Sequence, residues 1–402
     1  METGIRLRTP ALIALFFIPG VSIASWVTRT PDIRDLLGVS TMEMGIVLFG
    51  LSLGSMAGIL SSGALVSRFG ARRVILVGAV LIALSMPTIG IGAAAGAAGI
   101  VGFGLFLFGA GMGGSEVAMN IEGADVERER GRSFLPVLHG AFSLGTVVGA
   151  VIGIVTTAAA FPVEIHLAIV GVFAAVVSAL AIPQLPAATG QVRGKQQGEG
   201  AQARPQLWRD PTLLLIGVII LALSLAEGTA NDWLPLVMVD GHGFEAAWGS
   251  AIYAVFAASM TVGRFCGGWF IDRFGRAAVL CASGVFAAIG LVLIIFVDGQ
   301  AVAASAVVLW GLGASLGFPL AISAAGDSGP DSAARVSLAS TIGYIAFLVG
   351  PPALGFAGEE FGLRLALVIP LVLVVLAIAA AAGYGRRMRM LAARTREAEL
   401  AA

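Results

Sequence analysis

Charged residues are scarce in this sequence. Asp, Glu, Lys and Arg make up only 12% of its 402 residues, about half the share found in a typical soluble domain. The 24 bases are balanced by 24 acids, so the chain lacks the basic excess that marks a nucleic-acid-binding protein. Only two cysteines are present, which excludes a disulfide scaffold. These shortages argue against an ordinary soluble enzyme.

Motifs that bind nucleotides or metals are also missing from the sequence. It contains no glycine-rich phosphate loop, no catalytic triad and no zinc-binding spacing. The two cysteines, Cys266 and Cys281, are interpreted as small packing residues. We therefore expect no enzyme activity, no metal and no cofactor, and no energy supply from ATP.

Long apolar stretches dominate what is present. Hydrophobic residues make up 58% of the chain and the mean hydropathy is +0.95. A helix that crosses a bilayer needs about 20 mostly apolar residues. Twelve such stretches are found, at 10–30, 43–66, 74–94, 99–126, 134–158, 164–182, 211–231, 247–270, 277–297, 301–325, 336–357 and 363–384. The first has no small-residue cleavage site and is taken as an uncleaved helix. The sequence predicts an all-α membrane protein with twelve transmembrane helices.

One polar stretch, 183–210, interrupts the apolar pattern at the middle of the chain. It divides the twelve helices into two sets of six. We expect an N-terminal six-helix bundle over 1–182, a cytoplasmic linker over 183–210, a C-terminal bundle over 211–385 and a basic tail over 386–402.

The distribution of Lys and Arg predicts the orientation. Twenty of the 24 bases fall in alternate loops on one side of the twelve helices, in the linker or at the termini. Basic loops stay in the cytoplasm, so we expect a multi-pass protein of the inner (cytoplasmic) membrane with both termini and the linker in the cytoplasm.

A loop motif occurs twice, 205 residues apart, and its flanks keep the register: Gly58 aligns with Gly263. The motif residues are Gly63, Arg68, Gly70 and Arg72 in the first copy, and Gly268, Asp272, Arg273, Gly275 and Arg276 in the second. Parallel repeats of this kind build transporters whose site lies between the halves near the midplane. Two pseudo-symmetric six-helix bundles are therefore expected.

The doubled loop motif resembles that of the major facilitator superfamily (MFS), and the resemblance covers essentially the whole chain. It implies the MFS fold and a secondary transporter that works by alternating access, with the motif serving as a gating latch. In the first copy Ser67 stands where the family usually has Asp, which puts the acidic half of that latch in doubt. Short matches around Trp26, Glu116 and Glu227 resemble the fucose-permease-related, largely uncharacterised bacterial branch.

Ionisable residues inside apolar spans are costly, so each one needs a reason. Glu116 lies near the middle of its span, and Asn120 follows one helical turn later. His139 lies at the depth of Asn120 on the next span. The functional interpretation is a proton-carrying Glu116, a substrate-binding Asn120 and a proton-relaying His139. The alternatives are a hydrogen-bonded structural acid and a packing histidine.

A second polar stripe ends the span at 211–231. Ser224, Glu227 and Asn231 share one face, and we expect Glu227 to couple protons and Asn231 to bind substrate. Pro235 is expected to end this helix. Trp26 aligns with Trp233 and is expected either to bind substrate or to anchor the membrane interface.

Four further positions complete the expected site. Arg264 lies inside a span and is expected to form a structural pair with Asp272, with anion binding as the alternative. Tyr253 and Tyr344 are expected to offer hydroxyl groups to substrate. The run 350–352, Gly-Pro-Pro, is expected to break its helix.

These expectations point to proton-coupled uptake, or symport, of a small neutral solute such as a sugar. The expected cavity contains acids, amides and aromatics but no cation that is assigned to it, so organic anions are disfavoured as substrates. The alternatives are proton-driven efflux of a drug or cationic metabolite and a non-transporting receptor or scaffold. The expected partners are a small-molecule substrate, protons and the lipid bilayer, with no nucleic acid, and the protein is expected to be a monomer.

Overall fold

All regular secondary structure in the residues that the structure describes is helical. A computed structural model describes residues 2–130, 134–191, 207–329 and 332–401. Within them, twelve helical spans are long and apolar enough to cross a membrane. All twelve expected spans are confirmed, although their ends differ by several residues; the first runs over Arg6–Val27 rather than 10–30.

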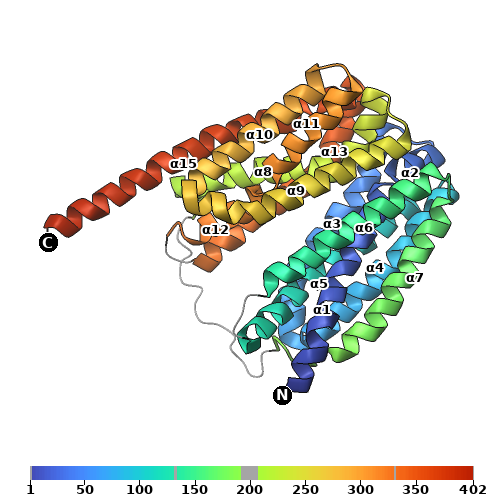
Figure 1. Cartoon of the computed structure of the whole chain (residues 1–402), viewed down its shortest axis with the longest axis horizontal. Coiled ribbons are helices and arrows are strands. Elements are labelled where there is room, and N and C mark those ends of the chain that lie inside the picture. Colours follow the sequence, from blue (N-terminus) through green and yellow to red (C-terminus); the bar gives the residue numbers. More distant parts are fainter. Residues whose placement is uncertain (1, 131–133, 192–206, 330–331, 402) are drawn as a thin grey trace. The chain divides into compact units, whose positions relative to one another are not determined.

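The helices run in chain order through the two halves (Figure 1). The first half contains α1 (Glu2–Val27), α2 (Thr30–Leu37), α3 (Thr41–Phe69), α4 (Ala71–Ala94), α5 (Ala98–Arg130), α6 (Leu135–Ala158), α7 (Val163–Ala181) and η1 (Ile182–Gln184). The second half contains η2 (Leu207–Arg209), α8 (Pro211–Leu236), η3 (Val237–Gly241), α9 (Ala246–Phe274), α10 (Arg276–Phe296), α11 (Gln300–Ala314), α12 (Gly317–Gly326), α13 (Ser332–Phe361), α14 (Leu363–Ala366) and α15 (Val368–Ala401).

The contacts divide the chain into two compact units. Unit 1 comprises Met1–Glu199, Leu234–Ala254 and Pro351–Glu359. Unit 2 comprises Gly200–Trp233, Val255–Gly350 and Glu360–Ala402. Most of the expected linker, 192–206, lies outside the described residues.

Small residues bring the helices of unit 1 close together. In this unit α1 packs against α6 and α7, and α5 packs against α3 and α4. A Cβ atom on Gly54 of α3 would lie 2.1 Å from the carbonyl oxygen of Phe106, and one on Gly109 of α5 would lie 2.1 Å from that of Leu51. Only glycine fits such an approach, which is how membrane helices gain packing contact without a hydrophobic driving force.

Local signals in the sequence set the ends of α2 and α3. Gly38 ends α2 in the left-handed conformation at φ +61°, which costs glycine little. Ser40 and Glu43 then form a reciprocal capping box at the start of α3. These bonds satisfy two backbone N–H groups that the first helical turn cannot pair.

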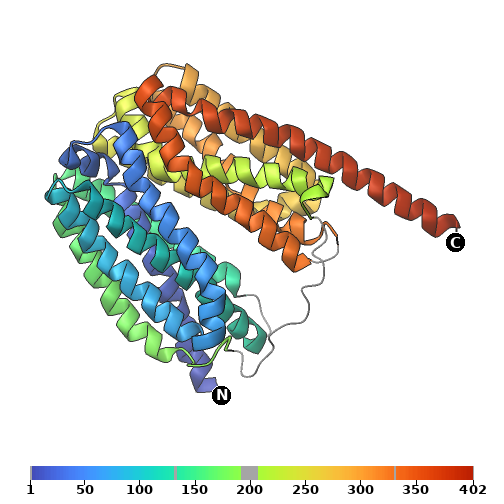
Figure 2. The ribbon, with the colours of Figure 1, turned by 180° about the vertical axis from the view of Figure 1, so that it is seen from behind.

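In unit 2, α10 packs against α11 and α15. Figure 2, the reverse view, shows α15 continuing as one helix past the ends of the other helices of this unit. The expected basic tail is therefore helical as far as Ala401.

Two expected helix breaks are wrong. Pro235 lies inside α8, which continues to Leu236 and then passes into a π-helical turn over Val237–Gly241. Pro351 and Pro352 lie inside α13, which is continuous from Ser332 to Phe361. A proline removes one backbone hydrogen bond, but neighbouring turns and the wider π turn compensate for that loss in a membrane helix.

Candidate functional site

An acid and a base from two helices meet in unit 2. Arg264 of α9 donates from Nη2 to Oε1 of Glu227 of α8 at 3.0 Å. Its Nε donates to the carbonyl oxygen of Ser315 at 3.3 Å. Glu227 lies near the midpoint of the 31-residue span Pro211–Gly241. The pair therefore lies where an isolated charge would be most costly.

The two partners differ in exposure. The side chain of Glu227 is 13% exposed, whereas that of Arg264 is 40% exposed. A guanidinium carries five N–H donors, so the exposed part of Arg264 leaves donors accessible to a ligand. Ser315 lies where the tenth span breaks between α11 and α12. Such a break presents a carbonyl oxygen at membrane depth, as the discontinuous helices of transporters do.

This geometry corrects two expectations. Arg264 pairs with Glu227 and not with Asp272, which is exposed on α9. Glu227 is central in its span and not near the outer boundary, because α8 continues past Pro235. The sequence predicts a cavity without an assigned cation, whereas the observed site contains Arg264.

Two other expected residues of unit 2 lie on nearby elements. Asn231 is half-buried on α8, one turn after Glu227. Tyr344 is half-buried on α13, and its ring centroid lies 6.2 Å from that of Phe318 of α12. Of the expected site residues, the structure brings Glu227 and Arg264 into direct contact.

The remaining expected residues belong to unit 1. Glu116 and Asn120 are half-buried on α5, and Tyr253 is buried on α9. His139 is exposed on α6, and its ring meets Phe16 of α1 edge-on with centroids 5.5 Å apart. In the described chain, no group of three His, Cys, Asp or Glu side chains is placed to hold a metal ion.

The two aligned tryptophans are buried. Trp26 is 1% exposed and Trp233 is 0% exposed. An interface anchor presents its ring to the lipid headgroups, so this alternative is wrong for both residues. No described group accepts a hydrogen bond from either indole Nε1, which leaves a donor at each position unused by the protein.

The loop motif forms a tight turn in each unit. Gly70 and Gly275 each end one helix and begin the next at φ +85° and +79°, a conformation that strains other residues. Arg276 then pairs with Asp327 at the end of α12. Arg68 and Arg273 are exposed and Arg72 is half-buried.

The other two motif glycines lie in open space. A Cβ atom on Gly63 or Gly268 would meet nothing within 4 Å. Both residues are exposed, so neither glycine lies at a close approach between two helices of its unit.

A buried ionic cluster in unit 1 escaped the sequence reasoning. Arg8 of α1, whose side chain is 4% exposed, contacts Glu122 and Asp125 at 2.7 Å each and Glu129 at 3.2 Å. All three acids lie on α5 and Glu122 is fully buried. The sequence contained a signal for Glu122, because this acid falls within the expected span 99–126. Arg8 gave no signal, because it precedes the expected first span.

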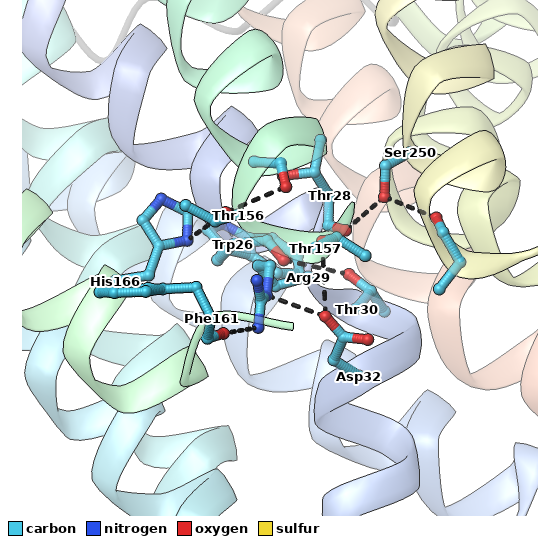
Figure 3. A network of polar contacts seen from close by, with 12 residues as sticks. Trp26, Thr28, Arg29, Thr30, Asp32, Thr156, Thr157, Phe161, His166 and Ser250 are labelled. Carbon is cyan, nitrogen blue, oxygen red and sulfur yellow. Dashed lines mark hydrogen bonds and ion pairs between the residues drawn. The ribbon is translucent and has the colours of Figure 1, made fainter. Parts of the chain in front are cut away.

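A second missed network surrounds the turn between α1 and α2 (Figure 3). Arg29, which is 3% exposed, donates to the carbonyl oxygen of Phe161 at 2.6 Å and pairs with Asp32 at 2.9 Å. Burial lowers the pKa of Arg29, and it raises the pKa of Asp32 even though Arg29 opposes that shift. Thr157 of α6 donates to Asp32 at 3.4 Å. The network anchors the start of α2 to α6 and to the segment before α7.

Three segments from later in the sequence bond to the first helices of unit 1. Ser250 of α9 donates to the carbonyl oxygen of Thr28 at 2.5 Å (Figure 3). Arg34 of α2 pairs with Asp240 of η3. The carboxylate of Glu359 accepts from the backbone N–H of Met42 at 3.2 Å. These contacts tie the ends of η3, α9 and α13 to the first three helices.

Known proteins resemble this chain along most of its length. The family model of the Major Facilitator Superfamily matches residues 11–337. An uncharacterised MFS-type transporter of Yersinia pestis is 31% identical over 370 residues, covering 91% of this chain and 92% of that protein. An uncharacterised transporter of Sinorhizobium fredii, y4wD, is 30% identical and covers 90% and 95%.

Solved structures share the fold. A mutant of the nucleoside transporter NupG superposes with a TM-score of 0.75 at 14% identity, covering 94% of this chain and 99% of that one. A variant of the E. coli fucose:proton symporter FucP superposes with a TM-score of 0.63 at 19% identity, covering 94% and 98%. At these identities the likeness shows the fold alone. Together with the twelve spans and the doubled loop motif, these matches show that the chain belongs to the major facilitator superfamily and is a transporter of that superfamily.

Proposed function

We propose that the protein carries out proton-coupled uptake of a small neutral polyhydroxylated solute such as a sugar, by alternating access. The observation that carries this proposal is the Glu227–Arg264 pair at the middle of its span. Because its two charges cancel, the pair favours a substrate that carries no net charge. A carboxylate and a guanidinium together offer both acceptors and donors to hydroxyl groups.

The exposed part of Arg264 also weighs against the rival functions. A cationic drug would meet a like charge at this position, which disfavours its binding. An organic anion would have to compete with Glu227 for the guanidinium. Two proteins of the same fold support the neutral solute, because FucP is a fucose:proton symporter and NupG is a nucleoside transporter. Both are neutral solutes that contain a sugar ring.

Glu116 is the proposed proton carrier and Glu227 the second choice. Glu116 is half-buried near the middle of the span Ala98–Arg130, where a carboxyl group can be charged only at a cost. Energy would come from the proton gradient without a cofactor. The protein would act as a monomer in the cytoplasmic membrane, with both termini in the cytoplasm.

The test begins with ligand binding. Purified protein is screened by thermal shift against L-fucose, other sugars, uridine, amines and drugs. A stabilising solute is then offered, radiolabelled, to proteoliposomes under an inward proton gradient. We expect accumulation above equilibrium that a protonophore abolishes. Extrusion of the solute would instead show efflux, and absence of any proton or solute movement would favour a receptor.

The role of Glu116 is tested in the same vesicles. Glu116→Gln should lose gradient-driven accumulation and keep solute counterflow, because exchange needs no net proton transfer. Glu360→Gln, which alters an exposed acid at the end of α13, serves as the matched control. Unchanged accumulation in Glu116→Gln would exclude this residue as the proton carrier.

A further inference from the structure

Two polar triads with the same spacing lie on α1 and α8. Ser22, Ser25 and Trp26 lie on α1, and Thr229, Asp232 and Trp233 lie on α8, each 207 residues later. The spacing i, i+3, i+4 places the members of each triad on one helix face. In each unit, therefore, one helix carries a polar face at a corresponding position.

Both triads are buried and short of partners. Every one of the six side chains is 5% exposed or less. No described group bonds the hydroxyl oxygens of Ser22, Ser25 and Thr229 or the indole nitrogens of Trp26 and Trp233. Buried polar groups in native proteins are nearly always paired, so five unpaired ones in matched positions point to occupants other than the protein itself.

Asp232 is the ionisable member of the two triads. Its side chain is 5% exposed, and among the residues that the structure describes none forms a hydrogen bond or an ion pair with this carboxyl group. The charged pair on the same helix, Glu227 with Arg264, is already satisfied five residues earlier. A buried carboxylate without a donor or a cation is strongly disfavoured, so the neutral acid is the form that fits this position.

We propose that Asp232 is a proton-binding group of the transport cycle and holds a proton in the conformation seen here. This inference rests on the proposed proton coupling and names a group that the sequence reasoning did not single out. Its carboxylate gains one proton and forms an O–H bond while it is open to one side of the membrane. The same bond breaks on the other side. Asp232 differs from Glu116, which is half-buried, and from Glu227, whose carboxylate is paired with Arg264.

The test is infrared spectroscopy of the full-length protein in phospholipid vesicles, without any solute. The spectrum of each variant is subtracted from that of the wild type. At neutral pH, the wild-type protein should show the carbonyl stretch of a protonated buried carboxyl group. Asp232→Asn should lose this band, whereas Asp232→Glu should shift it. Asp298→Asn, which alters a side chain that is 93% exposed, should leave the band unchanged. A spectrum of Asp232→Asn that equals the wild-type spectrum in this region would overturn the proposal.

Folding and function are checked separately. Asparagine has nearly the shape of the neutral acid, so Asp232→Asn should keep the size-exclusion profile and melting temperature of the wild type. It should lose proton-driven accumulation and keep counterflow. A lost band with unchanged accumulation would overturn the coupling role of Asp232 and leave proton-coupled uptake standing. Because the infrared signal needs no solute, a failed uptake assay of the wild-type protein would leave the assignment of the proton intact.

Discussion

Glu122 and Asp327 lie 205 residues apart, the same offset as the two copies of the loop motif, yet they bond to different arginines. Asp327 pairs with Arg276 of the second motif copy, whereas Glu122 pairs with Arg8 of α1. In the first copy Ala71 stands at the position of Arg276. The acid is thus kept in both units, but in unit 1 its cation comes from outside the motif.

Removing the charge of Glu122 should destabilise the protein. Arg8 is buried, and loss of one partner from a buried ion pair costs about 3–5 kcal/mol. Since Arg8 would still contact Asp125 and Glu129, we expect Glu122→Gln to cost about 3 kcal/mol, at the lower end of that range. The measurement is the melting temperature in detergent.

The matched control changes another acid of the same cluster. The side chain of Glu129 is 44% exposed, so water can replace its bond to Arg8, and Glu129→Gln should cost below about 1 kcal/mol. Equal losses in the two variants would show that burial of Glu122 is not what stabilises the cluster.

A double-mutant cycle should reveal the Glu227–Arg264 pair. Glu227→Gln and Arg264→Gln each leave one charge unpaired at membrane depth, and the double variant leaves none. We expect a coupling energy of about 1 kcal/mol, because Arg264 is partly exposed. The double variant should therefore lose less melting temperature than the two single variants lose together. The pair Arg364–Asp298 is also within ion-pair distance at 2.8 Å, but the side chain of Asp298 is 93% exposed, so this pair should show a smaller coupling.

Asp210 should make the stability depend on pH in the acid range. Burial alone would raise the pKa of Asp210, but hydrogen bonds from Arg335 and from the backbone N–H groups of Thr212 and Leu213 lower it. A lowered pKa gives stability that is present above the ordinary value near 3.8 and is lost as the pH falls through the pKa of the folded protein.

Asp210→Asn keeps a side chain that caps a helix well and removes only the charge. We expect it to cost about 1–3 kcal/mol at pH 7, with a difference from wild type that shrinks as the pH is lowered below about 4. Melting temperatures between pH 7 and pH 3 test this. Arg335→Gln removes the same ion pair and should show the same trend. A difference that stays constant over this range would contradict the prediction.

The glycines of the first loop motif should respond differently to substitution. Gly70→Ala forces φ +85° and ψ 154° on a residue with a Cβ atom, which costs about 1–3 kcal/mol. That Cβ atom would also lie 2.5 Å from the carbonyl oxygen of Ala187. At Gly63, which lies within α3, an added Cβ atom would meet nothing within 4 Å. Gly63→Ala should therefore stabilise the helix by about 0.5–1 kcal/mol. Opposite shifts in melting temperature are therefore expected, and equal shifts would contradict them.

The spans and the repeat could be predicted from the sequence because both depend on local composition. Apolar length alone decides whether a helix can cross a membrane. The helix break expected at Pro235 failed because the cost of proline depends on whether neighbouring turns can compensate for the lost bond.

The partners of the buried charges could not be predicted in the same way. Arg264 and Glu227 lie on different helices, and the rotation of each helix decides which of several acids the guanidinium meets. Asp272, on the same helix as Arg264, looked nearer in the sequence. Arg8 and Glu122 are separated by 114 residues, so only the packing of α1 against α5 brings them together.

The buried indoles give this protein optical reporters of its own. Trp26, Trp233 and Trp310 are each 1% exposed or less, and no described group accepts a hydrogen bond from their Nε1 atoms. An indole that is shielded from water emits at shorter wavelength than a hydrated one. Any step that admits water or a solute to these rings should therefore shift the emission to longer wavelength or quench it. Stopped-flow fluorescence of the unlabelled protein can then follow such a step in real time.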